Sequence, residues 1–118
     1  MRGFFRMLKG DPPPRMQNMK DLINPNNAIQ TSQRISASGM PAQEKMAALE
    51  NMRYAIQGNE NLTLDQQDRA LSENIIASEQ VAAEAGHISW DDFYQYERDA
   101  RQDVEQRIAT RHMLRSGL

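Results

Sequence analysis

The chain lacks cysteine altogether, and this absence removes several kinds of chemistry. Without thiols there are no disulfide bonds, no thiolate nucleophile, no iron–sulfur cluster and no cysteine-ligated zinc. Aromatic residues are also scarce, with three Phe, three Tyr and one Trp among 118 residues. A small domain buries only a modest fraction of its surface and is marginally stable for that reason. We therefore expect a thin core that depends on a partner or a second copy.

Long apolar runs are missing as well. No stretch approaches the roughly 18–20 residues that cross a bilayer. The most apolar stretch near the N-terminus, residues 4–8, is short and contains Arg6, whereas a secretory signal needs an apolar run of about 7–15 residues. We expect a chain without a membrane span that is not secreted by a signal peptide and resides in the cytoplasm or within a virion.

The net charge of -2 conceals an uneven distribution along the chain. Residues 1–40 carry a net charge of +4, residues 41–106 carry -9, and residues 107–118 carry +3. Basic ends thus flank an acidic middle. Oppositely charged surfaces are available for contact with a second copy or with another partner.

Apolar residues at helical spacing predict two consecutive helices after residue 40, which form a hairpin. The first begins at Pro41 and ends at Gly58, because glycine readily adopts the left-handed conformation of a helix end. The second begins at Thr63, an N-cap with Gln66 at capping-box spacing, and ends at Gly86. The faces expected to pack are Met46, Leu49, Met52 and Ile56 in the first helix and Leu64, Leu71, Ile75, Ala82 and Ala85 in the second, with Ile76 and Val81 beside them.

Ser89 gives the strongest helix-start signal in the chain. It is an N-cap residue followed by Asp91 and Asp92, whose charges the helix dipole favours. The helix should extend to Arg115, pack at its start and project at its end, because its apolar stripe thins. The cluster at its start, expected to pack on Leu71 and Ile75 of the preceding helix, comprises Ile88, Trp90, Phe93 and Tyr94.

Residues 1–39 are predicted to form an N-terminal arm, partly extended, beside a helical domain over residues 41–115. The three prolines after Asp11 forbid helix and favour polyproline II. Asn24 and Pro25 have the pattern of an N-cap and a first helical residue, but few large apolar residues follow them. The predicted fold is all-α, with a three-helix core made of the hairpin and the long C-terminal helix, plus the extended arm.

No motif predicts a catalytic, cofactor or metal site. His87 and His112 each lack the further ligands that a metal needs, and we interpret them as a solvated turn residue and a cation at a helix end. Residues 59–65 place side-chain oxygens at alternate positions, as a calcium loop does. An EF-hand starting there needs Gly and Glu where Leu64 and Ala70 stand. We therefore predict that the protein is not an enzyme and has no cofactor.

The basic ends supply the candidate partner contacts. Residues 1–9 have the pattern of a short basic amphipathic turn, which would dock its apolar side chains into a groove of a protein. Basic segments with aromatics also bind nucleic acid, but the sequence pI of about 5.6 opposes this as the main role. The predicted contact residues are Arg2, Phe4, Phe5, Arg6, Leu8, Arg107 and Arg111.

These features favour a non-enzymatic structural or adaptor subunit of a larger protein assembly, as a homo- or hetero-oligomer. The short, cysteine-free composition rich in Gln and Met suggests, more specifically, a minor virion protein of a tailed bacteriophage. The alternative is a small regulator or inhibitor that binds nucleic acid or a nucleic-acid enzyme. The acidic residues 41–106 would then mimic the phosphates of the nucleic acid for such an enzyme.

Overall fold

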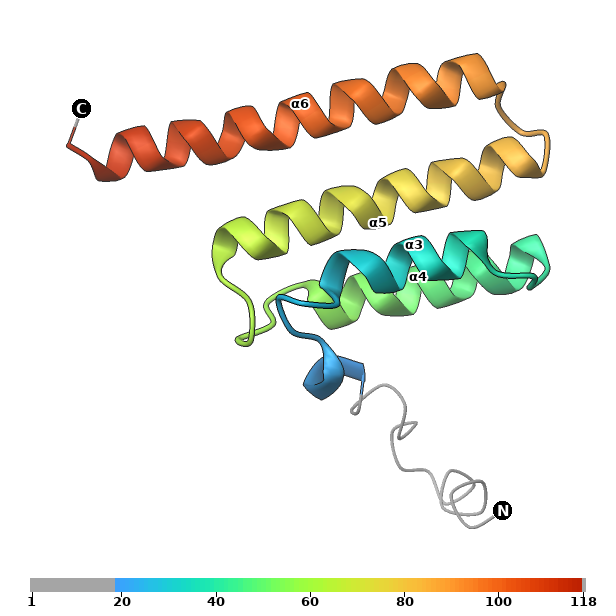
Figure 1. Ribbon diagram of the computed structural model, residues 1–118, viewed down its shortest axis with the longest axis horizontal. Helices are drawn as coiled ribbons and strands as arrows, with labels where there is room; N and C mark the ends of the chain where they lie inside the picture. Colours follow the sequence, from blue (N-terminus) through green and yellow to red (C-terminus); the bar gives the residue numbers. More distant parts are fainter. Residues whose placement is uncertain (1–18, 118) are drawn as a thin grey trace, which may run out of the picture.

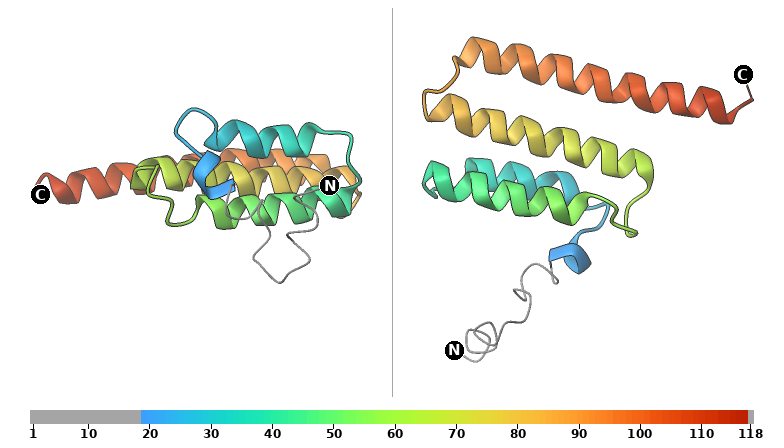
Figure 2. Two further views of the ribbon diagram at one scale, coloured as in Figure 1. Left: turned by 90° about the horizontal axis from the view of Figure 1, so that it is seen from below. Right: turned by 180° about the vertical axis from the view of Figure 1, so that it is seen from behind.

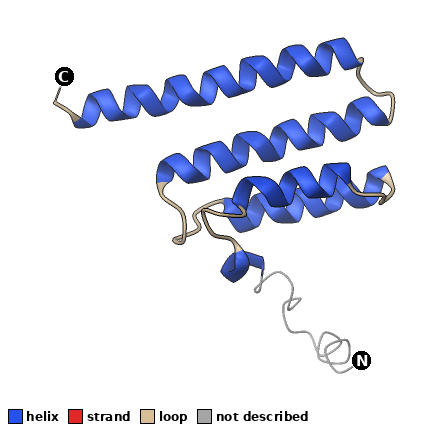
Figure 3. Cartoon of the chain, in the orientation of Figure 1, coloured by secondary structure: helices blue, strands red, loops and turns tan. Residues whose placement is uncertain are grey.

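The computed structural model describes residues 19–117, and the regular structure in this range is helical. One helical turn over residues 19–22 precedes four helices: α3 (Ala28–Ala37), α4 (Ala42–Ile56), α5 (Leu64–Glu84) and α6 (Trp90–Arg115). No strand occurs among the described residues (Figure 3). The all-α prediction is confirmed. Within residues 19–117, no helix has both the length and the apolar composition that crossing a membrane requires.

Three of the helices form a layer. α4, α5 and α6 lie side by side as antiparallel neighbours, with α5 in the middle (Figure 1). α3 lies on one face of this layer, where it packs against both α4 and α5 (Figure 2). α6 makes its extensive contacts with α5 alone. It is therefore the outer helix of the fold, supported from one side.

Local capping sets the helix boundaries as the sequence predicts. The Thr63 hydroxyl accepts from the backbone N–H of Gln66 at 3.1 Å, and the Gln66 side chain accepts from the backbone N–H of Thr63 at 2.8 Å, which completes a capping box. Ser89 caps α6 through its hydroxyl at 3.0 Å. Gly58 and Gly86 end α4 and α5 with φ of 64° and 83°, a conformation that favours glycine.

A buried asparagine joins α3, α4 and α5. The Asn74 side-chain amide is fully buried and donates to the Ser32 hydroxyl at 3.1 Å and to the Leu49 carbonyl at 2.9 Å. Its oxygen accepts from the Arg53 guanidinium at 2.9 Å, and Arg53 also donates to the Ser78 hydroxyl at 3.3 Å. The described residues contain no buried side-chain nitrogen or oxygen without a hydrogen bond. The buried polar side chains of this range are therefore satisfied, as a stable core requires.

Apolar residues fill the space around this network. The largest cluster lies between α4, the start of α5 and the segment before α3, while smaller clusters lie along α5. The buried members are Ile23, Ala28, Met52, Ala55, Ile56, Leu62 and Ala70 in the first cluster, Leu49, Ala77 and Val81 in the second, and Ile76, Ala83 and Phe93 in the third.

α3 belongs to the core, although the sequence analysis placed residues 1–39 in an arm. Its buried positions, Ala28, Ser32 and Ser36, recur every four residues on one helical face. Their small side chains let α3 lie close to its neighbours, and Lys45 of α4 donates to the Ser36 carbonyl at 2.8 Å. The sequence did not predict this contact because α3 has few large apolar residues. Small residues and hydrogen bonds make the contact instead.

The start of α3 also differs from the prediction. Asn24 and Pro25 do not open the helix; they belong to a turn, and α3 begins at Ala28. The Asn24 side chain accepts from the backbone N–H of Asn26 at 2.8 Å, and the Asn27 side chain accepts from that of Asn24 at 3.0 Å. Asparagine side chains bonded to nearby backbone in this way stabilise turns in preference to helix.

The apolar face of α5 is broader and composed differently from the one predicted. Leu64 is 63% exposed and Ile75 is 38% exposed. Because α5 is the central helix, it is buried on several sides, and much of its buried surface is small or polar. The buried positions are Ala70, Asn74, Ile76, Ala77, Ser78, Val81 and Ala83.

The aromatic cluster at the start of α6 packs elsewhere than predicted. Phe93 is buried and contacts the cluster of Ile76 and Ala83, not Leu71 and Ile75. Trp90 and Tyr94 touch Phe93, with ring centroids 5.7 and 5.5 Å from its own, but they remain 42% and 49% exposed. Phe93 stands at the hydrophobic-staple position after the Ser89 cap and points into the core. Its neighbours Trp90 and Tyr94 stay at the surface.

α6 packs further along its length than its thinning stripe predicts. Val104 and Ile108 are both buried against the rest of the fold. Beyond them, Met113 and Leu114 are 55% and 69% exposed. Only the last turn of the helix therefore projects.

Replacing Asn74 by alanine should lower the free energy of unfolding by roughly 2–4 kcal/mol, because three hydrogen bonds are lost and buried groups stay unpaired. Urea unfolding followed by circular dichroism measures this. Gln106→Ala, at an exposed position of α6, is the control and should change stability by less than about 0.5 kcal/mol. Equal effects of the two substitutions would contradict the structural role of the Asn74 amide.

Phe93→Ala should cost about 3–5 kcal/mol, as expected for a buried aromatic residue. Ser89→Ala removes only a helix cap and should cost about 0.5–2 kcal/mol. Thermal melts of the two variants measure the order of the effects. A Phe93→Ala variant that melts above Ser89→Ala would show that Phe93 contributes little to the core.

Candidate partner-binding groove

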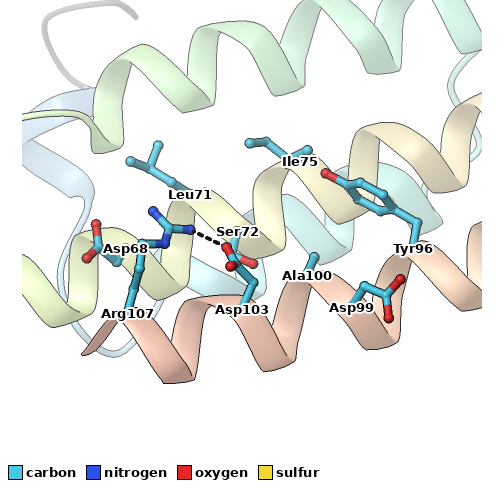
Figure 4. A pocket seen from close by; sticks show the side chains of 9 residues that line it. All are labelled: Asp68, Leu71, Ser72, Ile75, Tyr96, Asp99, Ala100, Asp103 and Arg107. Atoms are coloured by element: carbon cyan, nitrogen blue, oxygen red, sulfur yellow. Dashed lines mark hydrogen bonds and ion pairs between the residues drawn. The ribbon is translucent and has the colours of Figure 1, made fainter. Parts of the chain in front are cut away.

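A groove lies between α5 and α6 on the face of the molecule shown in Figure 4. Its volume is about 430 Å³, and it is open to solvent. α5 contributes side chains over about two turns and α6 over about three. The lining residues are Asp68, Leu71, Ser72 and Ile75 from α5 and Tyr96, Asp99, Ala100, Asp103 and Arg107 from α6.

The floor of the groove is apolar. Leu71 and Ile75 lie one turn apart on α5, and Ala100 faces them from α6. The Ala100 side chain is small, and Ile75 is 38% exposed. Isoleucine gains about 1.5–3 kcal/mol from complete burial. The floor would therefore be stabilised by a further apolar group placed over it.

The rim of the groove is acidic. Three aspartates, Asp68, Asp99 and Asp103, line the groove together with one arginine, Arg107. Arg107 pairs with Asp103 at 3.2 Å, four residues apart on the same face of α6. Within residues 19–117, Asp99 accepts hydrogen bonds only from the neutral side-chain amide of Gln95, at 3.0 Å. Its charge is therefore not neutralised by that contact, and the rim keeps a net negative charge.

Tyr96 closes one end of the groove. Its ring leans over Ile75, as Figure 4 shows. Burial raises the pKa of the Tyr96 hydroxyl, and the nearby Glu79 carboxylate raises it further, while Arg53 opposes this. The hydroxyl therefore stays protonated at neutral pH and offers a hydrogen-bond donor beside the apolar floor.

An ionic cluster fastens α6 to the start of α5 beyond the other end of the groove. Arg111 donates to both Asp65 and Asp68, and His112 lies 2.6 Å from the second oxygen of Asp65. Partial desolvation raises the pKa of Asp65, but the hydrogen bonds and charges of His112 and Arg111 outweigh it, so that the pKa lies below its ordinary value. The folded protein thus favours the ionised carboxylate.

The predicted contact residues fall into three groups. Arg107 lines the groove. The Arg111 guanidinium is half-buried and engaged by two carboxylates of its own chain, so it serves the α5–α6 contact. The remaining predicted contacts, Arg2, Phe4, Phe5, Arg6 and Leu8, lie outside the described residues.

Sequence reasoning missed the carboxylates that face α6. Asp65 and Asp68 are three residues apart on α5, and this spacing places the two acids on the same face of the helix. Arg111 and His112 are adjacent basic residues near the end of α6. Each pattern alone is ordinary for a helix end, and only the antiparallel packing of the two helices shows that they meet.

The asparagine loop over residues 59–61 makes structural hydrogen bonds. Within residues 19–117, no group of three or more His, Asp and Glu side chains could hold a metal ion. The Asn59 side-chain amide instead donates to the Lys20 and Ala55 carbonyls at 2.8 and 2.9 Å, and the Asn61 amide donates to the Ile23 carbonyl at 3.1 Å. The loop therefore holds the segment before α3 in place.

Comparison of the chain with protein-family models, with curated proteins and with solved structures gives no match. The geometry of the described residues therefore carries the functional interpretation.

Asp65→Asn should lower the melting temperature most at neutral pH, since the pKa of Asp65 is depressed in the folded protein. A depressed carboxyl pKa stabilises the fold above its ordinary value of 3.8, and this contribution disappears as the pH falls through the lower folded value. The difference between Asp65→Asn and the unmodified protein should therefore shrink as melts are repeated from pH 7 to pH 3. Glu50→Gln, at an exposed position of α4, should show no such trend; a constant difference for Asp65→Asn would refute the assignment.

Proposed function

We propose that this protein is a non-enzymatic structural or adaptor subunit of a larger protein assembly, and that the α5/α6 groove is one of its contact surfaces. The observation that carries this proposal is the packing of α6 on α5 alone, which leaves an open apolar floor between the two helices. Grooves between helices accept the apolar face of a further helix or segment. A subunit in an assembly would gain this missing contact from its neighbour.

Exposed apolar side chains on α6 support the same proposal. Trp90 and Tyr94 lie at one end of the helix, and Met113 and Leu114 at the other. Trp and Tyr are typical of protein–protein interfaces because they combine a large apolar area with a polar tip. α6 thus presents contact residues at both ends as well as along its groove.

A minor virion protein of a bacteriophage is the more specific form of this proposal. Its support is the composition of the chain, which is short, cysteine-free and rich in Gln and Met. The groove and the exposed ends of α6 suit an assembly built from repeated protein contacts, as a virion is.

The acidic rim also suits the alternative, a regulator that occupies the nucleic-acid site of an enzyme. Residues 19–117 contain ten Lys and Arg against fifteen Asp and Glu, so this part of the chain would repel nucleic acid itself. Binding to DNA that weakens steeply with salt would favour direct nucleic-acid contact through the basic N-terminal segment. Absence of such binding favours a protein partner.

Light scattering on the purified protein should give a mass above the 13.5 kDa of one chain. Ile75→Lys places a charge on the groove floor and should weaken self-association by about 10- to 100-fold, the equivalent of one large apolar side chain. Leu22→Lys is the matched control, since Leu22 is 67% exposed and lies outside the groove. Both variants should keep the melting temperature of a correctly folded chain.

A protein that stays monomeric at high concentration, with a cooperative melt and no co-purifying partner, would overturn the proposed function. Equal association of the two lysine variants would instead show that the assembly uses another surface.

A further inference from the structure

The α5/α6 groove and the N-terminal segment of the chain have complementary patterns. The groove has an apolar floor at Leu71 and Ile75 and an acidic rim that includes Asp99 and Asp103. Residues 1–9, which lie outside the described part, are basic and rich in large apolar residues. Opposite charges around matching apolar centres favour the docking of one on the other.

Spacing within residues 1–9 sharpens this complementarity. The apolar Phe4, Phe5 and Leu8 recur at intervals of three and four residues, and the basic Arg2, Arg6 and Lys9 recur at the same intervals. On a helical turn each set would occupy one side, the two sides being adjacent. Such a segment can place its apolar side chains on a floor while its cations reach the carboxylates on the rim.

We propose that residues 1–9 of one copy of this chain dock in the α5/α6 groove of a neighbouring copy. This inference rests on the proposed function, because it names the segment that would fill the contact surface. Phe4, Phe5 and Leu8 would cover Leu71 and Ile75, and the basic residues would face the rim. The groove on the first copy would in turn receive the segment of another copy.

The rim offers carboxylates for such pairs. The carboxylate of Asp99 meets only the neutral Gln95 amide in the described contacts, so an incoming cation would find a charge that those contacts leave uncompensated. Asp103 already pairs with Arg107, at 3.2 Å on the exposed surface of α6. Exposed pairs of this kind are worth little, so the Asp103 carboxylate can exchange or share its partner at small cost.

The connection between the segment and the fold favours a neighbouring copy over the same chain. The helical turn over residues 19–22 lies beside α4, on the side away from α6 (Figures 1 and 2). Residues 10–18 would span about 28 Å in polyproline II, at roughly 3.1 Å per residue, and prolines 12–14 make such a spacer stiff. A path from the turn over residues 19–22 to the groove of the same chain crosses α4 and α5, which a stiff spacer would follow poorly.

Disulfide trapping in the full chain tests the contact directly, since the natural sequence has no cysteine. Met7→Cys is made in one preparation and Ala100→Cys, in the groove, in another. After mixing and mild oxidation, a disulfide between positions 7 and 100 should form and be identified by mass spectrometry of the linked peptides. Ala109→Cys is the matched control, because Ala109 is exposed on α6 but does not line the groove.

The expected result is a clear excess of the 7–100 disulfide over the 7–109 disulfide. Equal yields of the two would overturn the inference. A chain carrying both Met7→Cys and Ala100→Cys distinguishes the source of the segment, since a disulfide formed chiefly within single chains would overturn the assignment to a neighbouring copy. Association without any 7–100 preference would leave the proposed function in place and remove only this inference.

Charge substitutions provide a second readout that does not depend on cysteine geometry. Asp99→Asn should lower the 7–100 yield by roughly 1.5- to 5-fold, the usual effect of one exposed ion pair. Glu50→Gln, on α4 and outside the groove, should leave the yield unchanged. Salt at about 1 M, where the Debye length falls to about 3 Å, should weaken the contact in the unmodified background but have less effect after Asp99→Asn. A yield that ignores both salt and Asp99 would contradict the role of the rim.

Discussion

The side-chain amide of Asn74 is the contact on which the arrangement of α3, α4 and α5 depends. It joins a hydroxyl of α3, a backbone carbonyl of α4 and the guanidinium of Arg53 at one fully buried point. Such a group is costly to bury unless each of its hydrogen bonds is made. Sliding or rotating any of the three helices would break at least one of them. The network therefore fixes the register of the three helices. Many of their buried apolar side chains are alanine, and these alone would specify that register poorly.

α6 is held by different forces. Phe93, Val104 and Ile108 are its buried apolar residues, and ion pairs supply much of the rest of its contact with α5. Exposed ion pairs contribute little individually and weaken with salt, so this interface should be less robust than the one around Asn74. The pairs that join the two helices are Arg69 with Glu105, Arg101 with Glu73, Arg111 with Asp65 and Asp68, and His112 with Asp65.

This division of the fold explains where a partner would bind. The face of α4 and α5 that carries α3 is covered, whereas the groove between α5 and α6 on the face drawn in Figure 4 is open. An outer helix supported from one side, with an apolar floor next to it, is suited to a contact completed by another chain. For the proposed contact, the acidic rim favours a partner with positive charge around an apolar centre.

The sequence by itself determined the helix class and the ends of α5 and α6, because caps and helix-ending glycines act over a few residues. Only the tertiary structure decided what depends on neighbours distant in the chain. It brought α3 into the core through Ser32 and Ser36, turned Phe93 toward Ala83, and joined Arg111 to acids on α5. Small and polar buried residues give no apolar periodicity, and a surface groove exists only once two helices are placed side by side.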